Sequence, residues 1–206
     1  AEQVLTQRAA TPEVAARLLR LIAKWEARAA ATGEDIRTIN PIPENIAAGI
    51  TTLEEKSLGA VEKTGTGPLA GVLDYCERPS GAGLWLMDAW MSSYSLLPSF
   101  AAAGAQLVIY QLGGNELPPQ DAPLSANSPG LVAPLLTISG NPRTAEVAGD
   151  YLDVSTGGVL LGTETLDAAG ERILGEIVRA ANGRATRGET MRYPEPFEVF
   201  FEGPFN

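Results

Sequence analysis

Histidine is missing from this 206-residue sequence, and cysteine occurs once, as Cys76. Without histidine, the chain cannot form a Ser-His-Asp or Cys-His nucleophile system, and it lacks the commonest transition-metal ligand. A single cysteine excludes an internal disulfide and is typical of a reducing cytoplasm, where we expect this protein. Cys76 is best interpreted as a small buried apolar residue. Any catalysis by this chain therefore relies on carboxylates, lysine, hydroxyls and backbone donors.

Long apolar runs and positive charge are also scarce. No segment approaches the roughly 18 apolar residues that a membrane span needs. The start has neither a basic-then-apolar signal pattern nor an initiator methionine, which predicts an internal part of a longer chain. The net charge of −10 argues against binding to nucleic acid or an anionic membrane. A small anionic substrate stays compatible with it, because a few local donors outweigh a global field at short range.

Apolar residues make up 45% of the sequence, enough for the core of one domain covering residues 1–206. Thr11, Pro12 and Glu13 predict a helix start, and Gly33 marks the end of that helix. Apolar and helical patterns further along predict strands at 83–87, 106–112, 135–139 and 151–154, and helices at 53–61, 94–103, 143–150 and 163–183. The last helix shows an apolar face made of Leu166, Ala169, Ile173, Ile177 and Ala181.

This alternation predicts an α/β fold with a mostly parallel sheet flanked by helices, a Rossmann-like three-layer arrangement. An opening helix at 11–32 and an irregular motif loop at 40–66 precede the α/β core at 83–183, and an irregular aromatic tail follows at 184–206. Ligands bind such sheets beyond the carboxyl ends of the strands. That rule indicates three places, which are Asp88 onward, 113–115 and 140–143.

The motif loop concentrates groups that carry chemistry. Lys56 is a candidate to hold a substrate carboxylate or, if burial lowers its pKa, to act as a base. Glu55 is a candidate ligand for a hard cation or a proton acceptor. The alternative interpretation is a solvated helix start whose acids favour the helix dipole. The following segment, 63–68, lacks the Walker spacing and is better interpreted as an anion-binding turn.

Two further places have equally open interpretations. Asp88, at a predicted strand end, is either a metal ligand or general base, or a cap of the next element. Asn141 and Arg143 open a helix and offer donors to a carboxylate, or they simply start that helix. The terminal aromatic residues are interpreted as a packed tail or a partner contact.

The segment 40–59 reads NPIPENIAAGITTLEEKSLG. It resembles the signature of the C-terminal domain of the altronate/galactarate dehydratase family, approximately Asn-Pro-x-Pro-Gly-Asn followed by Thr-Thr-Leu-Glu-x-Lys-Ser-Leu-Gly. The similarity continues at KTGTGP (63–68), GLWLMD (83–88), AAGA (102–105), GNPR (140–143) and the 150–157 segment, and it covers nearly all of the chain.

The resemblance implies a lyase that converts a sugar acid to a 2-keto-3-deoxy acid by abstracting the α proton and eliminating water. It implies Lys56, Glu55 and Asp88 as catalytic candidates. The residues that it implies for substrate binding are Asn40, Asn45, Thr52, Lys63, Thr66, Gly113, Gly114, Asn141 and Arg143. A divalent metal, iron by resemblance, is expected to be bound mainly by segments outside this chain, and this resemblance leaves its ligands unknown.

Family members carry a histidine-bearing N-terminal domain and a middle segment with His and Cys motifs, so this chain alone is expected to be inactive. Its expected partners are a small sugar acid and the missing domains or a partner subunit, with a homo-oligomer as one further assembly. Two departures bear on the substrate and on catalysis: Ala89-Trp90-Met91 replaces Thr-Pro-Gly, and 111–115 replaces Thr-Thr-Gly-Arg-Gly. The alternative is a non-catalytic domain that binds a carboxylate or mediates assembly. A nucleotide-binding domain is disfavoured because Gly65, Gly67 and Gly71 miss the dinucleotide spacing.

Overall fold

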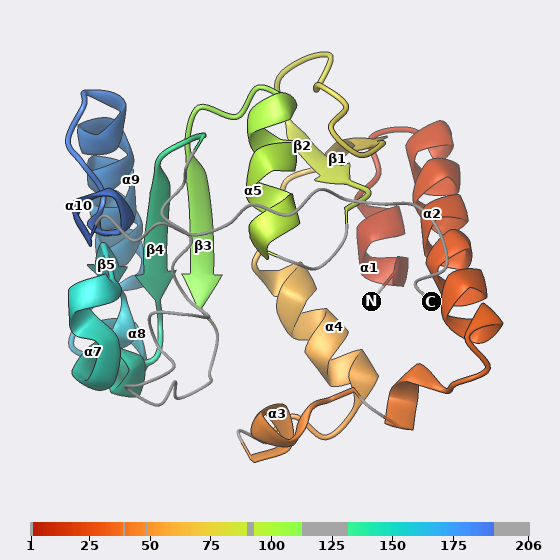
Figure 1. Ribbon diagram of the computed structural model, residues 1–206, viewed down its shortest axis with the longest axis horizontal. Helices are drawn as coiled ribbons and strands as arrows, with labels where there is room; N and C mark the ends of the chain where they lie inside the picture. The colour runs from red at the N-terminus through yellow and green to blue at the C-terminus, as the bar shows by residue number, and fades with distance from the viewer. Residues whose placement is uncertain (1, 39, 48, 90–92, 113–131, 192–206) are drawn as a thin grey trace. The chain divides into compact units, whose positions relative to one another are not determined.

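The computed structural model describes residues 2–38, 40–47, 49–89, 93–112 and 132–191 (Figure 1). The chain divides into two compact units, Ala1–Ala89 and Trp90–Asn206, and each is described by itself. The expectation that residues 1–206 form one domain stays a prediction.

The first unit is built around the helix predicted to start at Thr11. Helix α2 (Pro12–Ala31) has Thr11 as its N-cap, and the threonine hydroxyl accepts a hydrogen bond from the Val14 amide. Proline at the first helical position fits because that position needs no amide donor. The helix ends at Thr32, and Gly33 follows with φ +79°, a conformation that glycine adopts at little cost. This predicted helix is confirmed at both ends.

A parallel strand pair forms the sheet of the first unit. Strand β1 (Leu69–Leu73) pairs with β2 (Leu84–Met87), with a shift of register between Leu69 and Gly71. The Leu69 amide donates to the Arg8 carbonyl and the Ala10 amide donates to the Leu69 carbonyl, which extends the pairing by one short segment. Strand β2 was predicted, whereas β1 was not, because Gly71 lies at its centre and glycine is unfavourable inside a strand. The ring of Trp85 occupies the space that a Cβ on Gly71 would need, which explains a glycine inside this strand.

The core of the first unit joins three helices to β1. Its buried residues come from α1 (Glu2–Gln7), α2, α4 (Leu53–Glu62) and β1. They are Leu5, Leu18, Val61, Leu69 and Val72. Burying a leucine side chain contributes about 1.5–3 kcal/mol. Packing of Val61 therefore fixes the C-terminal half of α4 against the unit's core.

The motif segment is more ordered than predicted. Residues 40–45 were expected to be a loop, but α3 (Pro43–Ala47) begins inside them, after a 3₁₀ turn at Ile36–Thr38. That part of the loop prediction is wrong, because Pro43 occupies a first helical position, where proline is favourable rather than disruptive. Helix α4 confirms the helix predicted at 53–61.

The second unit contains three parallel strands in the order β3-β4-β5. Strand β3 (Val108–Leu112) pairs with β4 (Leu135–Ser139), which pairs with β5 (Val154–Ser155), and Figure 1 shows the β3 and β4 arrows running in the same direction. All five residues of β4 are buried, as expected for a central parallel strand. Helix α5 (Ser93–Ala102) confirms the helix predicted at 94–103 despite its internal proline.

The remaining helices follow β4 and β5. They are α7 (Pro142–Ala148), α8 (Gly157–Leu160), α9 (Leu166–Ala181) and α10 (Arg187–Met191), with a 3₁₀ turn at Gly149–Tyr151. That turn includes Tyr151, the first residue of the strand predicted at 151–154, and β5 begins only at Val154. Neither α8 nor α10 was predicted, and the part of the predicted tail at 192–206 lies outside the described residues.

Helix α9 corrects the prediction in two ways. Its N-cap is Thr165 rather than Thr163, and Gly183 follows its end with φ +89° as predicted. Of the apolar face predicted for this helix, Ala169 is buried but Leu166 is 76% exposed. Periodicity locates an apolar face, but burial of its ends depends on what packs there.

The mixed α/β class with parallel strands and flanking helices is confirmed, with the strands divided between two small sheets. Among the described residues, no helix has both the length and the apolar character needed to cross a membrane.

Candidate functional site

The start of α4 is a complete capping box. The Thr52 hydroxyl accepts a hydrogen bond from the Glu55 amide at 3.1 Å. In return, the Glu55 carboxylate accepts from the amides of Thr51 and Thr52 at 2.9 and 3.3 Å, and from the Thr51 hydroxyl at 3.0 Å. The amide of Thr51 thereby lowers the pKa of Glu55 below its usual value. These bonds favour the interpretation of Glu55 as part of a helix start.

Lys56 lies one residue further along α4 and points elsewhere. Its ammonium donates a hydrogen bond to Oδ1 of Asn40 at 2.8 Å, across 16 positions of sequence, and both residues are half-buried. An ammonium has more N–H donors than this one bond uses, so it keeps donors for a ligand. The structure thus brings together two predicted site residues, one from each end of the motif.

Asn45 lies between them in sequence and is 8% exposed. Its backbone accepts a hydrogen bond from the Ile50 amide and donates one to Ile42, which folds the segment between Asn40 and α4 back on itself. A buried amide side chain in this fold is compatible with the role predicted for Asn45, and that role stays a prediction.

The turn at residues 63–68 is hydrogen-bonded to the side chain of Arg8. The Arg8 guanidinium donates to the Gly67 carbonyl at 2.8 and 3.0 Å and to the Thr64 hydroxyl at 2.9 Å. Carbonyl oxygens directed at an arginine form the opposite arrangement to backbone amides that bind an anion. Lys63, the C-cap of α4, and Thr66 are both exposed. This geometry favours a structural turn over an anion-binding one.

Asp88 joins the end of β2 to α2. Its carboxylate is 2.7 Å from the Lys24 ammonium and accepts a hydrogen bond from the Trp25 indole at 2.8 Å, and its amide donates to the Leu73 carbonyl. Asp88 is only 8% exposed. Sequence reasoning missed both partners, since Trp25 was assigned to the apolar face of the helix and Lys24 was not considered as a candidate. The bonds support a structural role for this acid.

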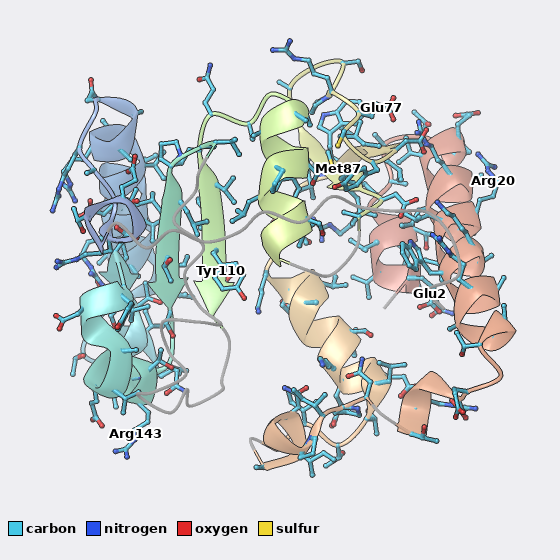
Figure 2. All side chains as sticks on the ribbon, viewed as in Figure 1. Glu2, Arg20, Glu77, Met87, Tyr110 and Arg143 are labelled. Carbon is cyan, nitrogen blue, oxygen red and sulfur yellow. The ribbon has the colours of Figure 1, made fainter. Side chains whose placement is uncertain are left out.

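In the second unit, Asn141 and Arg143 form an ordinary helix start. The Asn141 side chain caps α7 by accepting from the Arg143 amide at 2.9 Å. The Arg143 guanidinium is exposed and pairs with Glu146 at 3.1 Å, and Figure 2 shows its side chain pointing away from α7. The predicted residues Gly113 and Gly114 lie outside the described residues.

Cys76 departs from its expected environment. It is half-buried rather than buried, and its φ of 62° lies in the left-handed region that side chains other than glycine rarely adopt. Burial nevertheless raises the pKa of its thiol. A thiol with a raised pKa is a poor nucleophile, which agrees with the absence of a chemical role for Cys76 in the predictions.

The described residues do not offer a ligand set for the implied metal. In that part of the chain, no group of three or more histidine, cysteine, aspartate and glutamate residues comes together. Oε2 of Glu55 and both carboxylate oxygens of Asp88 already accept hydrogen bonds from N–H and O–H donors. Binding of iron by other segments stays a prediction, and the chemistry below is derived from this chain's own residues.

These features define an α/β protein in which a lysine of a capped helix bonds to the carboxamide of an earlier asparagine. The chain belongs to the D-galactarate/altronate dehydratase family, because residues 1–201 match the model of that family's C-terminal domain. The resemblance predicted from the motif at 40–59 is therefore confirmed.

Individual relatives are 27–34% identical to this chain over the residues that align. The beta subunit of (2R)-sulfolactate sulfo-lyase from Chromohalobacter salexigens is 34% identical over 163 residues, which are 78% of this chain and 39% of that protein. Altronate dehydratase from Bacillus subtilis is 30% identical over 199 residues, 95% of this chain and 37% of that protein. Galactarate dehydratase from Escherichia coli is 27% identical over 88% of this chain and 32% of its own length. The chain thus spans less than two fifths of these relatives.

Proposed function

We propose that this chain supplies part of the site of a lyase that dehydrates a sugar acid, similar to altronate or galactarate, to a 2-keto-3-deoxy acid. Other segments or a partner subunit complete the site. Membership of the dehydratase family supports the reaction class. One observation in the structure supports the location, namely the Lys56–Asn40 hydrogen bond, which joins the two ends of the motif at 2.8 Å.

In the proposed reaction a base removes the proton on the carbon next to the carboxylate. Electrons from that C–H bond build negative charge on the carboxylate oxygens. They then form the carbon–carbon double bond as the hydroxyl on the next carbon takes up a proton, which balances the one removed by the base, and leaves as water. The resulting enol loses its O–H proton, gains a proton at carbon and becomes the 2-keto-3-deoxy acid. The Lys56 ammonium, held in place by Asn40, is suited to bind the substrate carboxylate and stabilise the charge that develops there.

The proton acceptor is not assigned to Glu55 in this proposal. Its carboxylate accepts bonds from Thr51 and Thr52, and its pKa is lowered, both of which make it a weaker base. The base and the metal that the resemblance implies would come from the rest of the full-length protein. Substrate contacts by Asn45 and Asn141 also stay proposals.

The alternative is a non-catalytic domain that binds a carboxylate or mediates assembly. It is favoured by the observation that Glu55 and Asp88, two predicted catalytic acids, are bonded into a helix cap and a strand–helix link. It also agrees with the relative from Chromohalobacter salexigens being the beta subunit of its enzyme.

The test is release of keto acid by the full-length protein, supplied with ferrous iron and with altronate, galactarate or sulfolactate. Lys56→Met keeps the length of the side chain and removes its charge, and we expect kcat/KM to fall by about 100-fold or more. The matched control is Arg20→Met, which removes one positive charge from the exposed face of α2 (Figure 2). Lys56→Met within about twofold of wild type would refute the role of Lys56. A folded wild type that turns over none of these acids would support the binding domain instead.

A further inference from the structure

The second unit contains a polar cleft that no motif of the sequence indicated. Its volume is about 360 Å³, and its lining includes residues of β4, α9, α10 and the segment before β5. Leu136, which is 2% exposed, belongs to the apolar part of this lining. The charged part consists of two acids, Asp153 and Glu176, and two arginines, Arg184 and Arg187. Small-molecule sites typically have volumes of about 300–1,000 Å³, so the cleft has room for a ligand of about six carbons.

Both acids are held in fixed positions. The Asp153 carboxylate accepts hydrogen bonds from the amides of Thr137 and Arg187, each at 2.8 Å. Glu176 accepts bonds from the Arg179 guanidinium at 2.6 and 3.1 Å and from Arg184 at 3.2 Å. Since a carboxylate oxygen accepts more than one hydrogen bond, these acids are positioned acceptors for hydroxyl groups of a ligand.

Each arginine makes a hydrogen bond to one of the two acids, and both residues are exposed to solvent. Arg184 uses one guanidinium nitrogen for Glu176, and its side chain is 62% exposed. Arg187 is fixed through its own amide to Asp153, and its residue is exposed at the start of α10. A guanidinium carries several N–H donors in a planar fork that matches a carboxylate. The donors that remain therefore suit a carboxylate at the mouth of the cleft.

We propose that this cleft binds a small polyhydroxy carboxylate. Its carboxylate is bound by Arg184 and Arg187, and its hydroxyls donate to Asp153 and Glu176. Two acids and two arginines line the cleft, so an anion without hydroxyl groups gains little here, because it is repelled by two carboxylates to which it donates no hydrogen bond. The same argument applies to a polyol without a carboxylate, which leaves the guanidinium donors unused. The cleft belongs to the second unit alone, and the proposal goes beyond the site at Lys56.

Titration of the whole 206-residue chain with galactarate, followed by amide NMR shifts of Thr186, Arg187 and Thr190, tests the proposal. Adipate has the same carbon chain and both carboxylates but no hydroxyls, and galactitol has hydroxyls but no carboxylate. We expect galactarate to bind at least about tenfold more tightly than adipate, galactitol or inorganic phosphate, a difference of about 1.4 kcal/mol. Adipate or phosphate binding as tightly as galactarate would show a general anion site and overturn the proposal.

Variants then assign the binding to named residues. The double variant Arg184→Gln, Arg187→Gln should weaken galactarate binding by about tenfold or more, whereas Arg20→Gln should leave it unchanged. Glu176→Gln should reduce the preference for galactarate over adipate. Lys56→Met tests the dehydratase proposal and should leave these shifts in place, so the two proposals fail separately. Absence of saturable shifts with galactarate, or unchanged binding in the double arginine variant, would overturn the assignment.

Discussion

Replacing Asp88 by alanine removes the carboxylate that links the end of β2 to α2. Lys24 loses a bond of 2.7 Å and the Trp25 indole loses one of 2.8 Å. A hydrogen bond to a charged group contributes about 1.5–3 kcal/mol, and an unpaired buried donor costs about 1–3 kcal/mol. The Lys24 side chain is 43% exposed and can bond to water once Asp88 is replaced. The loss of its bond therefore costs an amount at the low end of the first range. We expect the free energy of unfolding to fall by about 2–4 kcal/mol.

Urea denaturation followed by tryptophan fluorescence measures this loss, because Trp25 is itself part of the link. With a slope of about 2 kcal/mol per molar urea, the midpoint should fall by about 1–2 M. Asp74→Ala is the matched control, since Asp74 follows β1 as Asp88 follows β2. The Asp74 side chain is 83% exposed and 3.2 Å from Arg17, so its loss should cost less than about 0.5 kcal/mol.

Equal midpoints for the Asp88→Ala and Asp74→Ala variants would refute this reasoning, because burial would then make no difference to the two acids. Retained stability with lost turnover in Asp88→Ala would instead support the catalytic role that the sequence alone predicted for Asp88.

The other predictions concern a helix cap, a strand glycine and a buried acid. Because hydrogen bonds from Thr51 lower the pKa of Glu55, its stabilising contribution is present above its usual pKa and lost as pH falls through the lowered value. The thermal midpoint of Glu55→Ala should therefore approach that of wild type on acidification, and a constant difference would contradict this. Gly71→Ala should cost about 1–3 kcal/mol and change the fluorescence of Trp85, whose ring fills the space of the added methyl; an unchanged urea midpoint would contradict the close contact. Burial raises the pKa of Asp153, so its contribution is greatest below its usual pKa and is lost as pH rises through the folded value. Wild type should lose stability relative to Asp153→Asn in urea denaturation as pH rises above the usual pKa of an aspartate, and an opposite trend would show a lowered pKa.

Local signals predicted much of the fold. Thr11 and Pro12 identified the start of α2, and a run of apolar residues located β4 at its observed bounds. The predictions that failed have local causes as well. Strand β1 was not predicted because it contains Gly71, and glycine is typical of turns. Helix α3 was not predicted because it begins at Pro43, and proline usually ends helices.

The candidate site was predictable in its residues but not in its contacts. The motif identified Lys56 and Asn40, yet nothing in the spacing showed that they bond to each other. For Glu55 the sequence offered chemistry or a solvated helix start as interpretations, and the capping bonds became visible only in the structure. The carboxylate of Asp88 was ambiguous for the same reason, since its partners lie on a helix more than 60 positions earlier in sequence.

The sequence by itself determined the family, the α/β class and the starts of α2 and α4, because these depend on residues close together in the chain and on a motif of about 20 positions. Tertiary structure decided which side chains meet. The Lys56–Asn40 pair, the Asp88 link to α2 and the cleft between Asp153 and Arg184 each join separate elements. Such contacts form only when apolar faces pack and bring distant polar groups within hydrogen-bond distance, and periodicity along a chain does not contain that information.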